Sequence, residues 1–183
     1  MIPCSTQIGG KYRPDDDTLF DIKRRLVDAG VIVTHPIADN MIFVKGGTGF
    51  AFDPTVYSFI EIERAYYLSI ARSTFHTVAN GNDLEGYIGE SACIELSFAM
   101  LLSRPILLTQ PPTYKEAVDP ALRELLIARN SLLEVHDLLS LTDSQLHAVI
   151  TQLGATGHVE YKLTSNEQAL VRSMVRSLFR GMK

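Results

Sequence analysis

The sequence predicts an α/β protein in which helices sandwich a parallel sheet, with a helical extension at the C-terminal end. Before Pro111, short apolar runs alternate with longer segments of helical periodicity, as expected for parallel strands joined by helices. After Pro111, strand-like runs give way to helix-like segments. We therefore expect an α/β domain over residues 1–112. Residues 113–183 are expected to form a helical extension that packs on this domain or on a partner subunit.

The predicted elements follow in order along the chain. A short apolar piece at residues 1–4 precedes a polar, glycine-bearing turn at residues 5–17. A helix is expected to follow and to stop at Gly30, and the β-branched run 31–36 reads as a buried strand. The elements expected next are an irregular stretch at 37–54 with a short strand at 41–44, a helix at 55–73, a strand at 74–80, a loop at 81–90, a helix at 91–103 and a strand at 104–109. In the extension, helices are expected at 121–141, 142–154 and 166–183, with Thr142 or Asp143 as the N-cap of the middle one.

The composition excludes several classes of protein. Hydrophobic residues make up 46% and charged residues 21% of the chain, as in a soluble globular protein. No apolar run reaches the roughly 18 residues that span a bilayer, and the N-terminus does not resemble a signal peptide. Two cysteines are too few for a disulfide framework, so we expect a cytoplasmic protein. The net charge of −4 argues against a nucleic-acid binder, although a helix N-terminus can still bind a small anion.

A single carboxylate, Glu95, interrupts the otherwise apolar or small-residue segment 91–103. The preceding loop follows a predicted parallel strand, so it lies at the sheet edge where ligands bind, and its glycines, Gly86 and Gly89, permit close approach of a ligand. With Ser91 as the N-cap, Glu95 would lie about one turn into the helix, where the helix dipole favours an ionised carboxylate. A nucleophilic carboxylate needs to be ionised, partly desolvated and fixed in direction, and this position can supply all three. The alternative is that Glu95 makes a structural bond to a loop amide or to an arginine.

The stretch "GYIGESACIELSFAMLLSRPILL" resembles the signature of the nucleoside 2-deoxyribosyltransferase-like superfamily. The N-terminal "CSTQIGGKYRPDDDTLFDIKRRLVDAG" is similar to the first loop and helix of the branch that hydrolyses deoxynucleoside monophosphates, and "IERAYYLSIARSTFHTVAN" fits the third helix and strand of the superfamily. The resemblance covers about residues 1–110. It implies a Rossmann-like or flavodoxin-like sheet and the chemistry of the N-glycosidic bond.

In that chemistry a carboxylate attacks the anomeric carbon of a nucleoside or nucleotide as the base departs, and the sugar then passes to water or to another base. Glu95 matches the nucleophile of the family. The resemblance assigns substrate contacts to the following residues: Ser5, Ile8, Gly9, Gly10, Gly89, Glu90 and Ser91. Family members are commonly dimers or larger oligomers, so we expect a homo-oligomer.

Two positions depart from the family pattern. Members commonly carry an Asp just before the strand at 74–80, where it handles the leaving base, but this chain has Arg72 or Ser73 there. Many members carry a Tyr in the first strand, where this chain has Ile2. The residues that could replace the missing acid or phenol are Glu90, Asp83, Glu85 and Tyr12.

Other motifs carry weaker signals. The five histidines show neither HxxxH nor HExxH spacing and the two cysteines are far apart, so we expect no metal and no other cofactor. His76 reads as a core imidazole within a strand, whereas His35 follows a strand at the ligand edge and is either a ligand contact or a solvated loop residue. "GGTGF" lacks the context of a dinucleotide fingerprint, and "GNDLEGY" lacks the Lys-Ser/Thr of a P-loop.

Three functions are consistent with these observations. The first is an enzyme that cleaves or transfers the N-glycosidic bond of a nucleoside or nucleotide with Glu95 as nucleophile. The second is a catalytically inactive relative that binds or senses a nucleotide, which the absent Asp favours. The third is a structural assembly protein without a small-molecule site.

Overall fold

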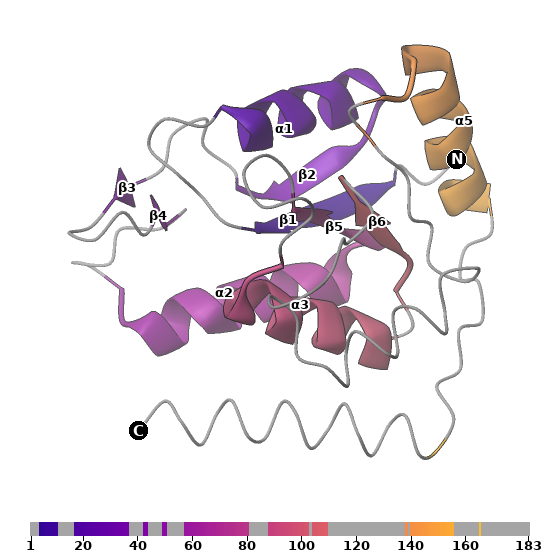
Figure 1. The fold of residues 1–183 in the computed structure, drawn as a ribbon. Helices are drawn as coiled ribbons and strands as arrows, with labels where there is room; N and C mark the ends of the chain where they lie inside the picture. Colours follow the sequence, from indigo (N-terminus) through magenta and orange to yellow (C-terminus); the bar gives the residue numbers. More distant parts are fainter. Residues whose placement is uncertain are drawn as a thin grey trace.

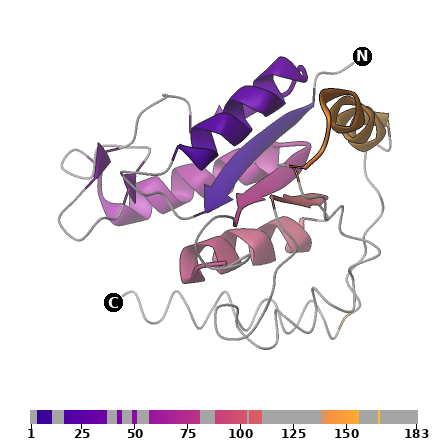
Figure 2. The ribbon, with the colours of Figure 1, turned by 45° about the horizontal axis from the view of Figure 1, so that its top comes forward.

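The computed structural model describes residues 4–10, 17–36, 42–43, 49–50, 57–80, 88–102, 104–109, 138, 140–155 and 165. Its main sheet has four parallel strands in the order β2-β1-β5-β6. The strands are β1 (Ser5–Gly10), β2 (Ile32–His35), β5 (Phe75–Ala79) and β6 (Ile106–Leu108). Helices α1 (Thr18–Asp28) and α5 (Asp143–Ala155) lie on one face, and α2 (Phe59–Arg72) and α3 (Glu90–Leu101) lie on the other (Figure 1). The predicted parallel sheet between helices is therefore confirmed, and Figure 2 shows α1 and α3 on opposite sides of the strands from a second direction.

Most predicted elements have counterparts in the structure. The strands at 31–36, 74–80 and 104–109 correspond to β2, β5 and β6, and the short strand at 41–44 is β3 (Ile42–Phe43), which pairs antiparallel with β4 (Gly49–Phe50). Helix α1 ends before Gly30, whose φ of 83° lies in the left-handed region that glycine adopts without strain. The helices expected at 121–141 and 166–183 lie outside the described residues.

The expectation for residues 5–17 is wrong at its start. Ser5–Gly10 is not a turn but the central strand β1, which pairs with both β2 and β5. Its polar residues concealed it, because a buried parallel strand normally reads as a continuous apolar run. Thr6 is buried with its hydroxyl 2.9 Å from the hydroxyl of Thr77 on β5, which satisfies both groups inside the sheet.

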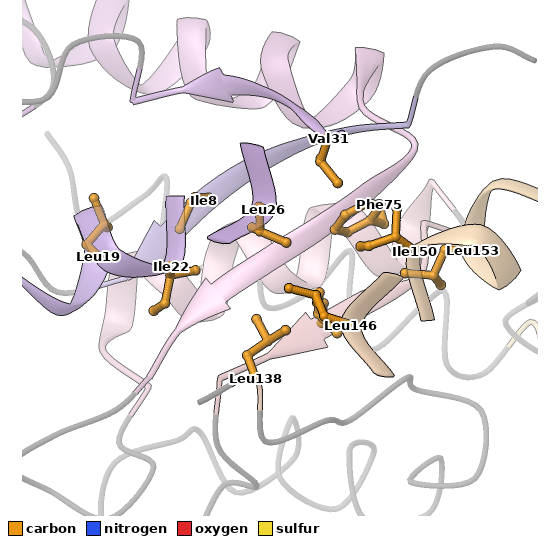
Figure 3. Packing of buried hydrophobic residues seen from close by; sticks show 11 residues of the cluster. Ile8, Leu19, Ile22, Leu26, Val31, Phe75, Leu138, Leu146, Ile150 and Leu153 are labelled. Atoms are coloured by element: carbon orange, nitrogen blue, oxygen red, sulfur yellow. The ribbon is translucent and has the colours of Figure 1, made fainter. Parts of the chain in front are cut away.

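Strand alternation assigns the side chains of β1 and β5 to two different layers. Ile8 and Phe75 pack with Leu107 against α1 and α5 (Figure 3). Because successive side chains of a strand point to opposite faces, Gln7, Gly9 and His76 face α2 and α3. On that side Val78 joins the core cluster of α3. Gln7 and His76 therefore lie on the face covered by α2 and α3, whereas the hydrogen-bonded pair Thr6 and Thr77 lies on the face of Ile8 and Phe75.

Helix α5 is part of the core on the α1 face. Leu146, Ile150 and Leu153 are buried in the same cluster as Ile8 and Phe75 (Figure 3). The guanidinium of Arg25, on α1, donates hydrogen bonds to the backbone carbonyls of residues 138 and 141, which precede α5. At the helix start the Thr142 amide donates to Gln145 Oε1 at 2.8 Å, and the Gln145 amide donates to Thr142 Oγ1 at 3.3 Å. These reciprocal bonds confirm Thr142, one of the two predicted residues, as the capping group.

Candidate functional site

The carboxyl group of Glu95 lies directly on the backbone of Gly9. A Cβ built on Gly9 would come within 1.9 Å of Glu95 Oε2 and within 3.3 Å of His76 Cε1, so only glycine leaves room for this carboxyl. Glu95 is 5% exposed. Gly9 is the last residue but one of β1, so Glu95, on α3, lies at the carboxyl edge of the parallel sheet. Ligands of parallel α/β sheets bind at this edge.

Two further polar side chains face Glu95 from the sheet. His76, on β5, is fully buried with its Nε2 4.0 Å from Glu95 Oε2. Gln7, on β1, is equally buried, and its side-chain amide stabilises the charged form of Glu95. Within the described part of the chain, Glu95 Oε2, the Gln7 amide atoms and both ring nitrogens of His76 have no hydrogen-bond partner. Buried polar atoms without partners are rare, and their gathering in one place is typical of a functional site.

Helix α2 adds two groups that the sequence analysis did not identify. Glu63 is 7% exposed, and its charge acts on Glu95. The phenol of Tyr67, one turn later on the same face of the helix, interacts with the Glu63 carboxyl and favours its ionised form. A signal for Glu63 was present, because it follows Ile62 on the face of α2 that continues through Tyr66 and Ile70. The argument applied to Glu95, a carboxylate among apolar positions, applies there too.

The helix does not hold Glu95 in its ionised form, contrary to expectation. Burial raises the pKa of Glu95 to about 8, and the neighbouring charge of Glu63 adds to this shift while Gln7 opposes it. The N-cap of α3 is Gly89 rather than Ser91, which makes Glu95 the sixth residue of the helix. The effect of a helix dipole fades beyond the first turn, so it does not offset the cost of burial here.

The other ionisable groups of the site also favour their neutral forms. Burial lowers the pKa of His76 to about 3, so its imidazole is neutral at physiological pH. Burial also raises the pKa of Glu63, while the phenol of Tyr67 opposes this shift. The pKa of the Tyr67 phenol is raised by burial first and by the charges of Glu63 and Glu95 next, so the phenol keeps its proton. The constellation can therefore hold protons at neutral pH and exchange them with a bound molecule.

Only part of the predicted substrate-contact set lies near Glu95. Gly9 meets it directly, and Gly10 follows at the same strand end with a φ of 143° and Ala79 O close beside it. Ser5 lies at the opposite end of β1, bonded to Thr74, so the structure does not bring it together with Glu95. The Ile8 side chain packs against α1 on the other face of the sheet, which leaves only its backbone for a ligand.

The predicted contacts at the start of α3 occupy its first residues. Gly89 is the N-cap without a side-chain bond, and Glu90 is the first helical residue. Ser91 is exposed and is not the cap, which corrects the expectation for that residue. The groups considered as replacements for the missing acid and phenol outside this helix, Asp83, Glu85 and Tyr12, lie outside the described residues.

His35 and Ser73 have structural partners instead. His35 Nδ1 lies 2.9 Å from Ser69 Oγ, and the ring meets Tyr66 edge-on at 5.9 Å. Ser73, which with Arg72 was considered for the place of the family's Asp, is buried and donates to the carbonyl of Ser69. The described residues contain no group of three or more His, Cys, Asp or Glu side chains that could hold a metal ion. None of the helices described here is long and apolar enough to cross a membrane.

Comparison with known proteins finds a structural neighbour. No protein-family model and no curated protein matches the chain. Among solved structures, the CMP N-glycosidase BcmB of Clostridium botulinum is similar at 12% identity and a TM-score of 0.43, over 81% of this chain and 98% of that one.

Proposed function

We propose that the protein cleaves or transfers the N-glycosidic bond of a nucleoside or nucleotide, with Glu95 as the nucleophile. The observation that carries this proposal is the Glu95 carboxyl on the bare backbone of Gly9, buried at the carboxyl edge of a parallel sheet. The sequence resemblance independently places the nucleophile of its family at this residue. No described arginine or lysine pairs with Glu95, which argues against a structural bond from this carboxylate to an arginine.

The reaction would proceed through an ester of the sugar. Glu95 attacks the anomeric carbon, the bond from this carbon to the base breaks, and the electron pair leaves with the base. Positive charge develops on the sugar in the transition state, and the adjacent carboxylate stabilises it. Water or a second base then attacks the same carbon and frees Glu95. Because burial raises the pKa of Glu95, its carboxyl must first lose its proton to solvent, and the positive charge that develops on the sugar then favours the carboxylate.

The decisive experiment measures release of free base by chromatography from a panel of ribo- and 2′-deoxyribonucleosides and their 5′-monophosphates. We expect turnover of at least one member, and we expect Glu95→Gln to abolish it. Glu61→Gln is the matched control, since Glu61 is an exposed residue of α2 and glutamine can still cap that helix. A wild-type protein that releases base from no member would contradict the proposal.

A covalent trap identifies the nucleophile directly. Fluorine at C2 of the sugar slows both steps by destabilising positive charge, so a 2-fluoro analogue of the active substrate should accumulate as an ester. Peptide mass spectrometry should locate the added sugar on Glu95. Its attachment elsewhere would refute the assignment of the nucleophile.

A second candidate function is binding of a nucleotide without cleavage. The neutral state that burial imposes on Glu95 at pH 7 favours it, because a protonated carboxyl can donate a hydrogen bond but cannot attack carbon. Calorimetry distinguishes the two functions. Saturable binding without base release, retained in Glu95→Gln, would select the binding protein.

A further inference from the structure

The site contains a second buried carboxyl that the proposed reaction has not yet used. Glu63 comes from α2, a different element from that of Glu95, and both helices cover the same face of the sheet (Figure 1). One of its oxygens, Oε2, makes no hydrogen bond within the described part of the chain, and the neighbouring phenol of Tyr67 favours the ionised form of this carboxyl. Burial of an acidic group without a cation costs free energy, so a purely structural role does not explain why Glu63 is buried.

The surroundings of Glu63 contain no described group that would neutralise its charge. On its own helix, Arg64 and Arg72 are exposed. From α3 it faces Glu95, and beside Glu95 on β5 stands His76, which is neutral at physiological pH. Arg104, which follows α3, donates to the carbonyl of Ala71. Two buried carboxyls for which the described residues supply no counter-ion cannot both ionise readily, so the pair retains a proton.

We propose that Glu63 is the acid that protonates the departing base and then the base that activates the incoming water, with Tyr67 holding its carboxyl in place. This role rests on the proposed function, and it supplies the group that the family places at a position where this chain has Arg72 or Ser73. In the first step Glu95 bonds to the anomeric carbon, the glycosidic electron pair moves to the base nitrogen, and the proton of Glu63 moves to the base. In the second step the Glu63 carboxylate takes a proton from water as the water oxygen attacks the sugar, and Glu95 leaves as a carboxylate. The sum is hydrolysis, with Glu63 reprotonated.

Two carboxyls with one proton between them are suited to this cycle. The acid must keep its proton until the base departs, and burial shifts the pKa of Glu63 in this direction. A protonated Glu63 carries no charge, so it does not oppose ionisation of Glu95. The reactive form, in which Glu63 is protonated and Glu95 is ionised, therefore arises from the fully neutral pair by loss of one proton.

The test compares two leaving groups. The substrates are the nucleoside or nucleotide that the wild-type protein turns over and the 4-nitrophenyl glycoside of the same sugar, whose phenolate departs without protonation. We expect Glu63→Gln to lower kcat on the nucleoside or nucleotide by about 10²–10⁴-fold, the usual contribution of a general acid, and to leave release of nitrophenolate within about tenfold of wild type. Glu95→Gln should lose both activities. Glu61→Gln, the same substitution at an exposed site of α2, should change neither.

Each result has a defined reading. Equal losses of Glu63→Gln on both substrates, or no loss on the first, would overturn the acid role while leaving Glu95 as nucleophile. Failure of the wild-type protein on both substrates would refute the proposed function and the acid role with it.

Should Glu63→Gln not fold, Tyr67→Phe provides the second test. Loss of the phenol removes an interaction that favours the Glu63 carboxylate, so the pKa of Glu63 should rise. The alkaline limb of the pH profile of kcat for Tyr67→Phe should therefore move to higher pH. An unmoved limb would overturn the role.

Discussion

The imidazole of His76 faces the carboxyl of Glu95 across 4.0 Å in the interior of the protein, between the sheet and α3. Burial pushes the two pKa values in opposite directions, to about 3 for His76 and about 8 for Glu95. Both groups are consequently neutral at pH 7, and the contact is not an ion pair. This relationship gives the stability of the protein a defined dependence on pH.

Glu95 should make the protein less stable as the solution becomes alkaline. Its pKa rises from an ordinary value of 4.5 to about 8 on folding, so between these values the native state binds more protons than the unfolded state and the free energy of unfolding falls with rising pH. Each pKa unit corresponds to about 1.4 kcal/mol, so Glu95→Gln should be more stable than wild type at pH 8 by on the order of 2–4 kcal/mol. Urea unfolding from pH 5 to pH 8.5 measures this, with Glu61→Gln as the control that keeps the wild-type slope. A slope unchanged in Glu95→Gln would contradict the prediction.

His76 should cause the opposite loss in acid. The unfolded state binds its proton near pH 6.5, whereas the native state resists protonation down to about pH 3, so stability falls as pH falls through this window. His76→Gln should flatten the acid side of the same urea series. His147→Gln, at an exposed position of α5, is the control. If both substitutions left the acid side equally steep, the buried neutral imidazole would not be its cause.

Alanine at Gly9 and at Gly10 should have different consequences. At Gly9 the new Cβ collides with the flexible end of Glu95, which can swing away, so Gly9→Ala should abolish base release and cost only about 1 kcal/mol of stability. At Gly10 the Cβ would lie 2.4 Å from the backbone oxygen of Ala79, and φ is 143°, so Gly10→Ala should lower the free energy of unfolding by roughly 3 kcal/mol or more. Base-release assays and urea unfolding of both variants test the contrast. An active Gly9→Ala protein would show that the carboxyl does not need its observed position.

The bonds from Arg25 should hold the segment that leads into α5. Arg25→Ala leaves the carbonyls of residues 138 and 141 without their donor, and we expect a loss of about 1–3 kcal/mol together with faster amide hydrogen exchange in α5. Arg24→Ala is the control, because Arg24 is exposed and pairs only with Asp21 on its own helix among the residues described. Equal exchange rates in α5 for the two variants would rule out this clamp.

The sequence predicts the fold well wherever strands are apolar and helices periodic. β2, β5, β6, α1, α2 and α5 have these patterns, and each lies where the pattern indicates. β1 lacks the pattern because Thr6 and Gln7 interrupt it, and only the strands on either side show that it lies at the centre of the sheet. Buried polar residues, whether bonded inside the sheet as Thr6 is or beside Glu95 as Gln7 is, thus hide the strand that carries them.

The site was predicted in part for a related reason. Glu95 stands out because its helix is apolar on every side, whereas Glu63 sits in a helix with many charges, and nothing in the spacing of the two residues brings them together. Their proximity follows from the packing of α2 and α3 on one face of the sheet. The homo-oligomer and the division of the chain at residue 112 stay predictions.

The fit between Gly9 and Glu95 also constrains how related sequences can diverge. A methyl group at position 9 leaves no space for a carboxyl on a two-carbon arm, but it is compatible with a shorter or smaller residue at position 95. The two positions should therefore vary together across homologues, glycine accompanying glutamate and bulkier residues accompanying the loss of that acid. Such coupled replacement would identify the homologues that keep the fold but have lost the carboxyl group at this edge of the sheet.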